Sequence, residues 1–481
     1  MKSKIFLLVI LNISVYNLLF ESIYSQQPTM EWVTRFHTAP FSKSLCTDET
    51  GNLFISGAAM VNTVYRTHFL TIKYNSSGVI QWNRVSEDTS SFSGSSSFAY
   101  KNVCDGSGNV YAAGRTSNYI YGSDILIIKY SSNGDSLWSA RYNGPGNADD
   151  ELTDMEIDKF SNIYLTGWSY GTPYNTEPNV DYVTIKYDFS GNRVWALRYN
   201  NFAGSTDRPV ALSIDSSQNI YVTGYCENSF GGIEYVTIKY NNSGVQQWVA
   251  KYNSDYLEAT ATSITVDKEQ NIYVTGHLEY FIMSDDNYIT IKYNPDGQVL
   301  WQKEFTYYAP GDDIPNEIFV DSLLNVYICG TSIVKYNSDG VFQWADTNTN
   351  PRSDYGAIDN KGNFYAIFYS DGIGTPVIKT VKYKTDGIKA WSVKYYKRND
   401  TVSQPSGIII NRNNDIFISG DTYVINTPNT DSIILIKYSQ PIGINDPAVI
   451  VPGSYLLYQN YPNPFNPTTK IRFALPISPQ R

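Results

Sequence analysis

The sequence predicts an all-β protein, an eight-bladed β-propeller of four-stranded antiparallel blades that is closed by the N-terminal strand. Three observations carry this prediction: a repeat of constant register, four short β runs in each repeat, and chain ends that complement each other. Composition agrees, because the 41 Tyr and 9 Trp favour pleated surfaces while the 33 Gly and 21 Pro supply turns. A length of 481 residues suits one large repeat architecture or several ordinary domains.

The repeat is marked by a Lys-Tyr pair that ends an apolar run eight times. Its lysines run from Lys73 to Lys437, so the seven intervals average 52 residues. An Asp four residues before an Asn precedes each pair, and a Gly-containing turn with a Trp follows the first seven. The Asp/Asn markers are Asp48/Asn52, Asp105/Asn109, Asp158/Asn162, Asp215/Asn219, Asp267/Asn271, Asp321/Asn325 and Asp359/Asn363, with Asn411/Asp415 in the eighth unit.

Each unit divides into four short β runs, most clearly in the fourth unit. The runs there are 211–214, 220–223, 235–240 and 245–252, each rich in β-branched or aromatic residues and bounded by turn signals. The first pair and the last pair are joined by connections short enough for hairpins. A period near 50 residues with four strands is typical of a propeller blade, whose faces must be covered by neighbouring blades.

The ends of the chain predict how the ring closes. The eighth unit stops at Lys437-Tyr438 without the turn and the Trp, whereas the chain begins with an unaccompanied fourth strand at 31–36. We therefore predict that Trp32–Phe36 pairs with the strand ending at Tyr438, which removes a sheet edge that would otherwise be exposed.

A family resemblance follows from these motifs. The recurring Asp-x-x-x-Asn-Ile-Tyr-x-x-Gly, acidic-x-x-x-x-Lys-Tyr and Gly-x-x-x-Trp pattern resembles the SBBP-type β-propeller repeat proteins of bacterial surfaces, over nearly all of 32–438. The resemblance implies a propeller fold and a surface location. It carries no established catalytic residues.

The N-terminal 25 residues have the layout of a secretory signal peptide. Lys2 and Lys4 precede an apolar run from Ile5 to Phe20, and small or polar residues follow, so the mature propeller is expected to span 26–440. A membrane anchor is the alternative, but the run is short for a bilayer and polar residues interrupt it. No later segment is apolar enough to span a membrane.

The C-terminal segment differs in composition from the repeats. Residues 441–454 form a Pro-rich linker, and 455–481 resemble the opening of a type IX secretion sorting domain, most clearly at 459–469. This implies a partner in the secretion machinery and a Gram-negative host. The family's domain continues for several more strands than this chain has, so we expect either a fragment or an incomplete signal. A Pro-rich tail without further function is the alternative.

Charge and motifs exclude several functions. A net charge of −10 argues against nucleic acid as a partner. No HExxH, GxSxG, P-loop or Rossmann pattern occurs, and the three His lie in different units, so no cofactor is predicted. The Asp-x-x-x-Asn turns share alternating oxygen ligands with calcium loops but lack the distal Glu. We interpret them as Asx turns and leave calcium open as a ligand.

Two repeated residue types are interpreted as structural. The eight Lys and the Trp of the repeats are expected to pack, with the lysine stem against an aromatic ring. The four cysteines are expected to be small buried residues without a disulfide. Only Cys46 and Cys104 lie in adjacent units, and their offsets from the local Asp differ by one, which predicts opposite faces.

Candidate ligand-binding residues lie where the units differ. The uniformly tight connections should line one face of the ring and the variable ones the other, where a loop of 168–181 in unit three contrasts with two residues in unit six. Aromatics with carboxylates suit sugar or cation binding, and solvated loops are the alternative. The candidates are Trp168, Tyr170, Tyr174, Asp149, Asp150, Asp285, Asp286, Asp312 and Asp313.

The function predicted from these features is a secreted or surface-attached, non-enzymatic propeller that binds a glycan, peptide or protein through its variable face. The alternatives are an extracellular carbohydrate-active hydrolase or lyase that uses loop carboxylates, and a structural component of the cell envelope. Two carboxylates converging near the ring centre would favour the enzyme, and a neutral centre would favour the scaffold.

Overall fold

The structure is a computed structural model of the whole chain. It describes residues 27–37, 40–61, 66–86, 96–118, 122–172, 180–252, 257–280, 286–306, 313–347, 353–370, 377–396, 402–423 and 432–440, together with 456–457 and 473–474. The expected signal peptide (1–25) and linker (441–454) lie outside these residues. The chain divides into two units, Met1–Ser439 and Gln440–Arg481.

The first unit consists of eight four-stranded sheets, which we number as blades 1 to 8. Blade 1 contains β2 (Pro40–Thr47), β3 (Leu53–Val61), β4 (Arg66–Tyr74) and β5 (Ile80–Val85). Blade 2 contains β6 (Ser96–Cys104), β7 (Val110–Asn118), β8 (Gly122–Tyr130) and β9 (Ser136–Tyr142). Blade 3 contains β10 (Asp150–Ile157), β11 (Ile163–Tyr170), β12 (Val180–Tyr187) and β13 (Arg193–Tyr199). Blade 4 contains β14 (Asp207–Ile214), β15 (Ile220–Glu227), β16 (Ile233–Tyr240) and β17 (Gln246–Tyr252).

The second half of the ring repeats this plan. Blade 5 contains β18 (Leu257–Val266), β19 (Ile272–Tyr280), β20 (Asn287–Tyr293) and β21 (Val299–Phe305). Blade 6 contains β22 (Pro315–Val320), β23 (Val326–Gly330), β24 (Ile333–Tyr336) and β25 (Phe342–Asp346). Blade 7 contains β26 (Ser353–Ile358), β27 (Phe364–Ser370), β28 (Val377–Tyr383) and β29 (Lys389–Tyr395). Blade 8 contains β30 (Val402–Ile410), β31 (Ile416–Tyr423), β32 (Ser432–Ser439) and β1 (Thr29–His37).

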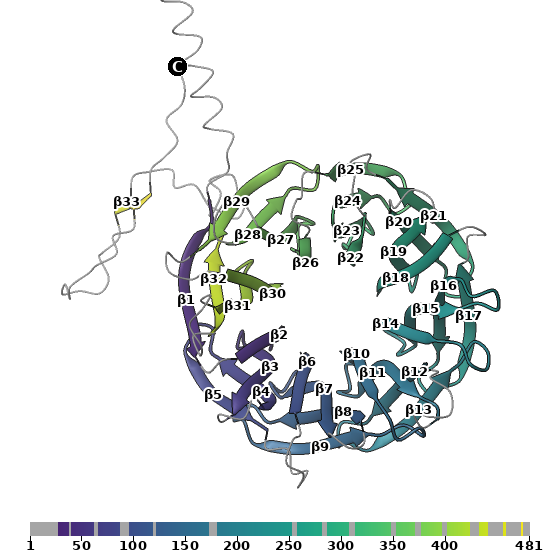
Figure 1. Cartoon of the computed structure of the whole chain (residues 1–481). Coiled ribbons are helices and arrows are strands. Elements are labelled where there is room, and N and C mark those ends of the chain that lie inside the picture. Colours follow the sequence, from purple (N-terminus) through teal and green to yellow (C-terminus); the bar gives the residue numbers. More distant parts are fainter. Residues whose placement is uncertain are drawn as a thin grey trace, which may run out of the picture. The chain divides into compact units, whose positions relative to one another are not determined.

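The blades form a closed ring with the first strand of each nearest the axis and the last outermost (Figure 1). Every pairing within a blade is antiparallel, and each pair of neighbouring blades buries an apolar layer between them, such as that of Tyr111, Ile127, Leu165 and Val183 between blades 2 and 3. The predicted eight-bladed, all-β fold is confirmed.

The predicted closure by the N-terminal strand is also confirmed. Strand β1 pairs with β32, from Thr29 opposite Ser439 to His37 opposite Ser432. Trp32 lies opposite Lys437, the same register in which Trp248 lies opposite Lys239 in blade 4. Trp32 is therefore the eighth tryptophan of the repeat, supplied from the other end of the chain.

The repeated Asp and Asn form the turns between first and second strands. In blade 4, Asp215 accepts hydrogen bonds from the backbone N–H of Ser217 and Asn219 and from the Asn219 side chain at 2.7–2.8 Å. The Tyr221 hydroxyl donates a fourth bond at 3.0 Å. These are Asx turns, as predicted, and the tyrosine fixes the second strand to the carboxylate that caps its own turn.

The repeated Lys and Trp hold neighbouring blades together. In blade 4, Lys239 Nζ and Trp248 Nε1 both donate to the carbonyl oxygen of Pro295, in the outer hairpin of blade 5, at 2.8 and 3.0 Å. Six blades make this paired contact, and in all eight the lysine ammonium lies over the aromatic ring of the second strand. The predicted packing role is confirmed, although it is the ammonium rather than the stem that meets the ring.

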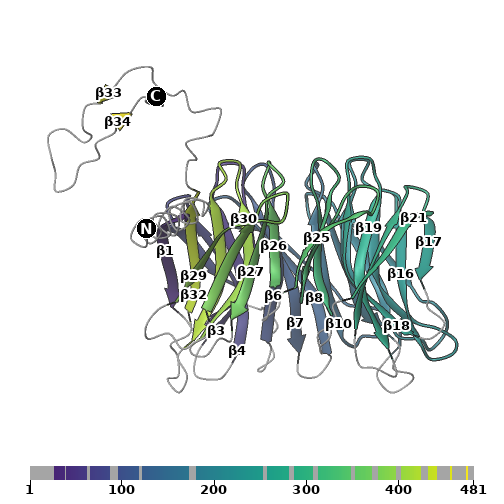
Figure 2. The ribbon, with the colours of Figure 1, turned by 90° about the horizontal axis from the view of Figure 1, so that it is seen from above.

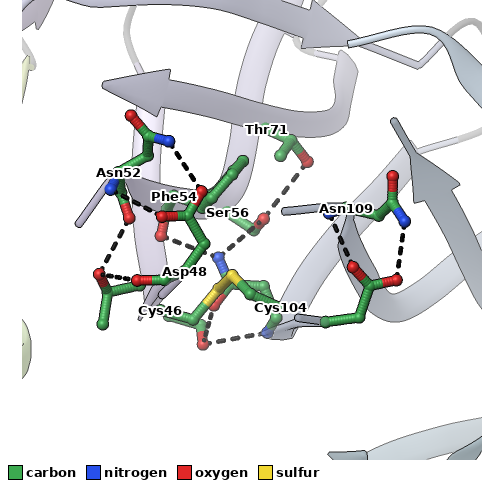
Figure 3. The surroundings of a disulfide bond; sticks show 12 residues. Cys46, Asp48, Asn52, Phe54, Ser56, Thr71, Cys104 and Asn109 are labelled. Carbon is green, nitrogen blue, oxygen red and sulfur yellow. Dashed lines mark hydrogen bonds between the residues drawn. A yellow bond between two sulfur atoms is a disulfide. The ribbon is translucent and has the colours of Figure 1, made fainter. Parts of the chain in front are cut away.

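The prediction that no disulfide forms is wrong. Cys46 and Cys104 are bonded (Figure 3), with their Cα atoms 6.4 Å apart. Cys226 and Cys329 are free and buried. The two bonded cysteines do lie on opposite faces of their own strands. Neighbouring blades pack with opposite faces of their sheets in contact. Because the positions of Cys46 and Cys104 within their repeats differ by one residue, both side chains point into the interface between blades 1 and 2.

The second unit is described at four residues. Strands β33 (Leu456–Leu457) and β34 (Phe473–Ala474) pair antiparallel.

Candidate functional site

The two sides of the ring differ as the connection lengths predict. In an antiparallel blade the first-to-second and third-to-fourth turns share one side, and these tight turns lie along the upper edge of the ring in Figure 2. The second-to-third and fourth-to-first connections share the other side, which we call the variable side.

The variable side carries one chemically diverse position per blade. It directly follows the glycine near the end of the second strand, or Phe368 in blade 7, and we call these eight residues the crown. They are Ala58, Arg115, Trp168, Tyr225, His277, Thr331, Tyr369 and Asp421. All except the buried Ala58 are half-buried.

A backbone bulge explains why a glycine precedes the crown. The first strand of every blade has an irregular residue at this level, for example between Pro209 and Ala211 in blade 4. The bulge presses a carbonyl against the second strand, so that a Cβ on Gly224 would lie 2.1 Å from the Arg208 oxygen. The rigid repeat therefore ends here, and the next residue is free to vary.

Trp168 is half-buried in the crown at the boundary of blades 3 and 4. The guanidinium of Arg208, on the first strand of blade 4, lies 4.5 Å from the centre of its ring. Tyr170 meets the same indole edge-on, with ring centres 6.1 Å apart. The structure thus brings together two of the predicted candidates, Trp168 and Tyr170, and adds an arginine that the sequence did not single out.

Three polar groups at this boundary make no hydrogen bond within the described part of the protein. The Arg208 side chain makes no hydrogen bond or ion pair there, and neither the Trp168 indole N–H nor the Tyr225 hydroxyl has a partner. Six tryptophans of the repeat, by contrast, donate this N–H to a carbonyl. Tyr225 lies directly opposite Arg208 in the sheet, and burial raises the pKa of its hydroxyl.

Two further aromatics of blade 4 are exposed on the variable side. Phe230 is 96% exposed at the tip of the Asn228–Gly232 turn, and Phe202 is 39% exposed in the connection that enters the blade. Sequence reasoning missed both because it surveyed the longest loop, whereas these residues stand in short, well-formed turns. A large apolar side chain at a turn tip is the signal that could have indicated Phe230.

The predicted acidic residues of blade 3 have structural partners. Asp149 accepts hydrogen bonds from the backbone N–H and the hydroxyl of Ser123, at 2.7 and 2.9 Å. Asp150 is buried and accepts from the Gly144 N–H at 2.6 Å, and burial raises its pKa to about 6. Both carboxylates therefore hold loop backbone on the variable side.

The other predicted acidic pairs are described in part. Asp286 and Asp313 are buried, and the Asp313 N–H donates to the Asp286 carbonyl, which joins blades 5 and 6. Asp286 also faces the crown residue His277 at 3.9 Å. The remaining candidates, Tyr174, Asp285 and Asp312, lie outside the described residues.

A second group of charges surrounds the ring axis, on first strands where no candidate was predicted. Lys101 of blade 2 forms an ion pair with Asp154 of blade 3 at 2.9 Å and interacts with Glu156 and with Glu317 of blade 6. Burial raises the pKa of both glutamates to about 7. Glu156 also lines a cleft of about 210 Å³ between blades 3 and 4 on the tight-turn side.

Part of this axial group has a structural role. Asp154 accepts a hydrogen bond from the Leu212 N–H of the next blade, and Glu317 accepts one from the Gly356 N–H, both at 3.0 Å. Ser44 and Ser263 occupy the same position in other blades and make the same bond. Glu156 lies two residues after Asp154, and it makes no such hydrogen bond to the next blade among the described residues.

Within the described ranges of the chain, no three or more His, Cys, Asp or Glu side chains gather as a metal site would require. Calcium binding stays a prediction. The described residues also contain no helix long and apolar enough to cross a membrane.

Comparisons with known proteins support the fold. The Dos1 propeller aligns with 87% of this chain and 96% of its own, with a TM-score of 0.52 at 10% identity. The C-terminal WD40 domain of Sif2 aligns with 85% of this chain and 98% of its own, with a TM-score of 0.50 at 10% identity. The chain is a β-propeller repeat protein. At this identity the likeness extends to the propeller fold and no further.

Sequence comparison adds one distant relative of the propeller. An uncharacterized WD repeat-containing protein, L264 of Acanthamoeba polyphaga mimivirus, is 22% identical over 200 residues, which span 32% of this chain and 14% of that protein. No family model matches the propeller sequence.

Proposed function

We propose that the protein is a non-enzymatic binding propeller that recognises a glycan, peptide or protein at the boundary of blades 3 and 4 on the variable side. The observation that carries the proposal is Trp168, whose ring contacts Arg208 over its face and Tyr170 edge-on, while its N–H has no partner in the described residues. Aromatic side chains of this kind supply a rigid contact surface, and Phe202 and Phe230 of blade 4 extend the apolar area on the same side.

The experiment is a glycan array probed with residues 26–440, with and without calcium, followed by binding curves for each positive glycan. Trp168→Ala should weaken binding by about 1–3 kcal/mol, because removing an aromatic anchor typically costs this much. Phe160→Ala is the matched control, since Phe160 is 56% exposed on the tight-turn side. Equal losses from both variants, or no loss from Trp168→Ala, would contradict the proposed site.

A hydrolase or lyase is the second candidate function, favoured by the carboxylates around the ring axis. Burial raises the pKa of Glu156 and Glu317 to about 7, which suits a general acid or base near neutral pH, and Lys101 interacts with both. Incubation of acidic and neutral polysaccharides with the protein, followed by product analysis, tests this candidate. Cleavage that Glu156→Gln abolishes would support it, and intact substrates would support the binding protein.

We also propose that the protein is secreted or displayed on the cell surface of a Gram-negative bacterium. The Cys46–Cys104 bond supports this location, because structural disulfides persist in oxidising compartments. Fractionation of cells with and without a functional type IX system tests it: we expect the protein outside the cell only when the system is present. Retention in the cytoplasm in both strains would contradict the proposal.

A further inference from the structure

We propose that Arg208, with Trp168 and Tyr225, forms a subsite for the carboxylate group of an acidic sugar, a uronate. The inference rests on the binding function proposed above and names its ligand class. It depends on three observations: the pairing of the basic side chains around the site, the stacking of Arg208, and the unused donors beside it.

Arg208 differs from the other basic side chains at this end of blades 2 to 4. Arg115 pairs with Glu151 at 2.8 Å, Arg198 with Asp181 at 2.6 Å and Lys251 with Glu234 at 3.0 Å. Arg141 pairs with Asp124 in the same way. Arg208 has no such partner among the described residues, although the protein carries a net charge of −10. Within the described part of this acidic protein, no carboxylate thus pairs with the Arg208 charge.

The stacking on Trp168 orients this charge. The guanidinium carbon lies over the ring, 4.5 Å from its centre, where cation–π attraction holds it, and no described residue accepts a hydrogen bond from its N–H groups. Two parallel N–H groups match the two oxygens of a carboxylate, which makes arginine suited to bidentate recognition. A cationic ligand would be repelled at this position, and a neutral one would leave the donors unused.

The neighbouring groups suit a sugar that carries the carboxylate. The Trp168 N–H and the Tyr225 hydroxyl have no partner in the described structure, and both can bond ring hydroxyls. Tyr170 and Trp168 supply aromatic surface for the apolar face of a pyranose. An acidic peptide offers the same carboxylate but no run of hydroxyls, so we favour the uronate.

The test measures binding of the propeller to oligosaccharides of galacturonate, glucuronate and mannuronate by calorimetry. The methyl esters of the same oligosaccharides and an acetylated Asp-Glu peptide serve as comparison ligands. We expect at least one uronate to bind, its methyl ester to bind about tenfold or more weakly, and Arg208→Gln to lose the difference between acid and ester. Arg208→Lys should recover only part of it, because lysine lacks the bidentate fork.

Arg412→Gln is the matched control, since the Arg412 side chain is 88% exposed in a tight turn of blade 8. Equal binding of acids and esters, tighter binding of the peptide, no binding of any uronate, or unchanged binding by Arg208→Gln would each overturn the proposal. The function proposed above fails separately: it falls if Trp168→Ala leaves binding of every array ligand unchanged. A melting temperature within the control's range confirms that Arg208→Gln is folded.

Discussion

Tryptophan occupies two kinds of position in this protein, one on the fourth strand of each blade and one in the crown. Comparison of the eight repeats shows which other residues occur at each position. The position of Trp248 is a tryptophan in all eight blades, once Trp32 is counted, and it bridges to the next blade. The crown position of Trp168 is an alanine in blade 1 and a threonine in blade 6. The same chain thus folds with small residues at the second position, whereas every blade has a tryptophan at the first.

We therefore expect Trp248→Ala to lower the free energy of unfolding by about 3–5 kcal/mol, because a large ring and its hydrogen bond are lost from a blade interface. Trp168→Ala should change it by about 1 kcal/mol or less, as for most substitutions away from a packed core. Chemical denaturation of both variants measures the difference. Similar losses would show that Trp168 belongs to the core.

A second prediction at this scale concerns the glycine before the crown. A Cβ on Gly276 would lie 2.1 Å from the Thr260 carbonyl oxygen, whereas one on Gly106 would meet nothing within 4 Å. Gly276→Ala should destabilise the protein by about 1–3 kcal/mol or more, because the bulged backbone has to move. Gly106→Ala is the control and should be close to neutral in thermal denaturation. A neutral Gly276→Ala would show that the bulge is not rigid.

At the scale of elements, the disulfide joins the first strands of blades 1 and 2 across 58 residues of sequence. Replacing Cys46 and Cys104 by Ser should lower the free energy of unfolding by about 2–4 kcal/mol, because the unfolded chain gains entropy when the disulfide no longer closes this loop. Thiol counting of the denatured, unreduced wild type should find two thiols, from Cys226 and Cys329. Four thiols would contradict the bond.

The strands and their order could be predicted from the sequence, because the markers recur in one register and the turns obey local rules. The contact between Cys46 and Cys104 could not, since it depends on which faces of two sheets meet, and periodicity within one strand does not decide that. Arg208 was missed for a similar reason: it lies 40 residues from Trp168 in sequence, and only the neighbouring positions of two blades bring them together. Loop length distinguished the two sides of the ring, but it did not indicate Phe202 and Phe230.

At the scale of the whole molecule, the charges around the axis predict how stability varies with pH. Burial raises the pKa of Glu156 and Glu317 from 4.5 to about 7, so the folded protein binds these two protons more tightly than the unfolded chain. Their contribution to stability is complete below the unfolded pKa and is lost as the pH rises through about 7. Asp150 and Asp207, raised to about 6, act in the same direction.

The melting temperature should therefore fall between about pH 5 and pH 8, and the double variant Glu156→Gln, Glu317→Gln should fall less steeply. Glu49→Gln, at a side chain that is 67% exposed, is the control and should follow the wild type. Differential scanning calorimetry of the wild type, the double variant and the control across this pH range measures these melting temperatures. Parallel curves for the wild type and the double variant would show that the axial carboxyls do not govern the slope.

The pairing of β1 with β32 has a consequence for how the ring is made. Glu31 and Ser439, which hydrogen-bond across the closure, are 408 residues apart, and bringing such distant ends together costs about 5 kcal/mol of chain entropy. Blades 1 to 7 contain only consecutive strands and can assemble in the order of synthesis, whereas blade 8 waits for the last strand of the ring. From the moment it is synthesised until β32 arrives, β1 has no partner strand, so the nascent chain is open to mispairing while all seven intervening blades are made.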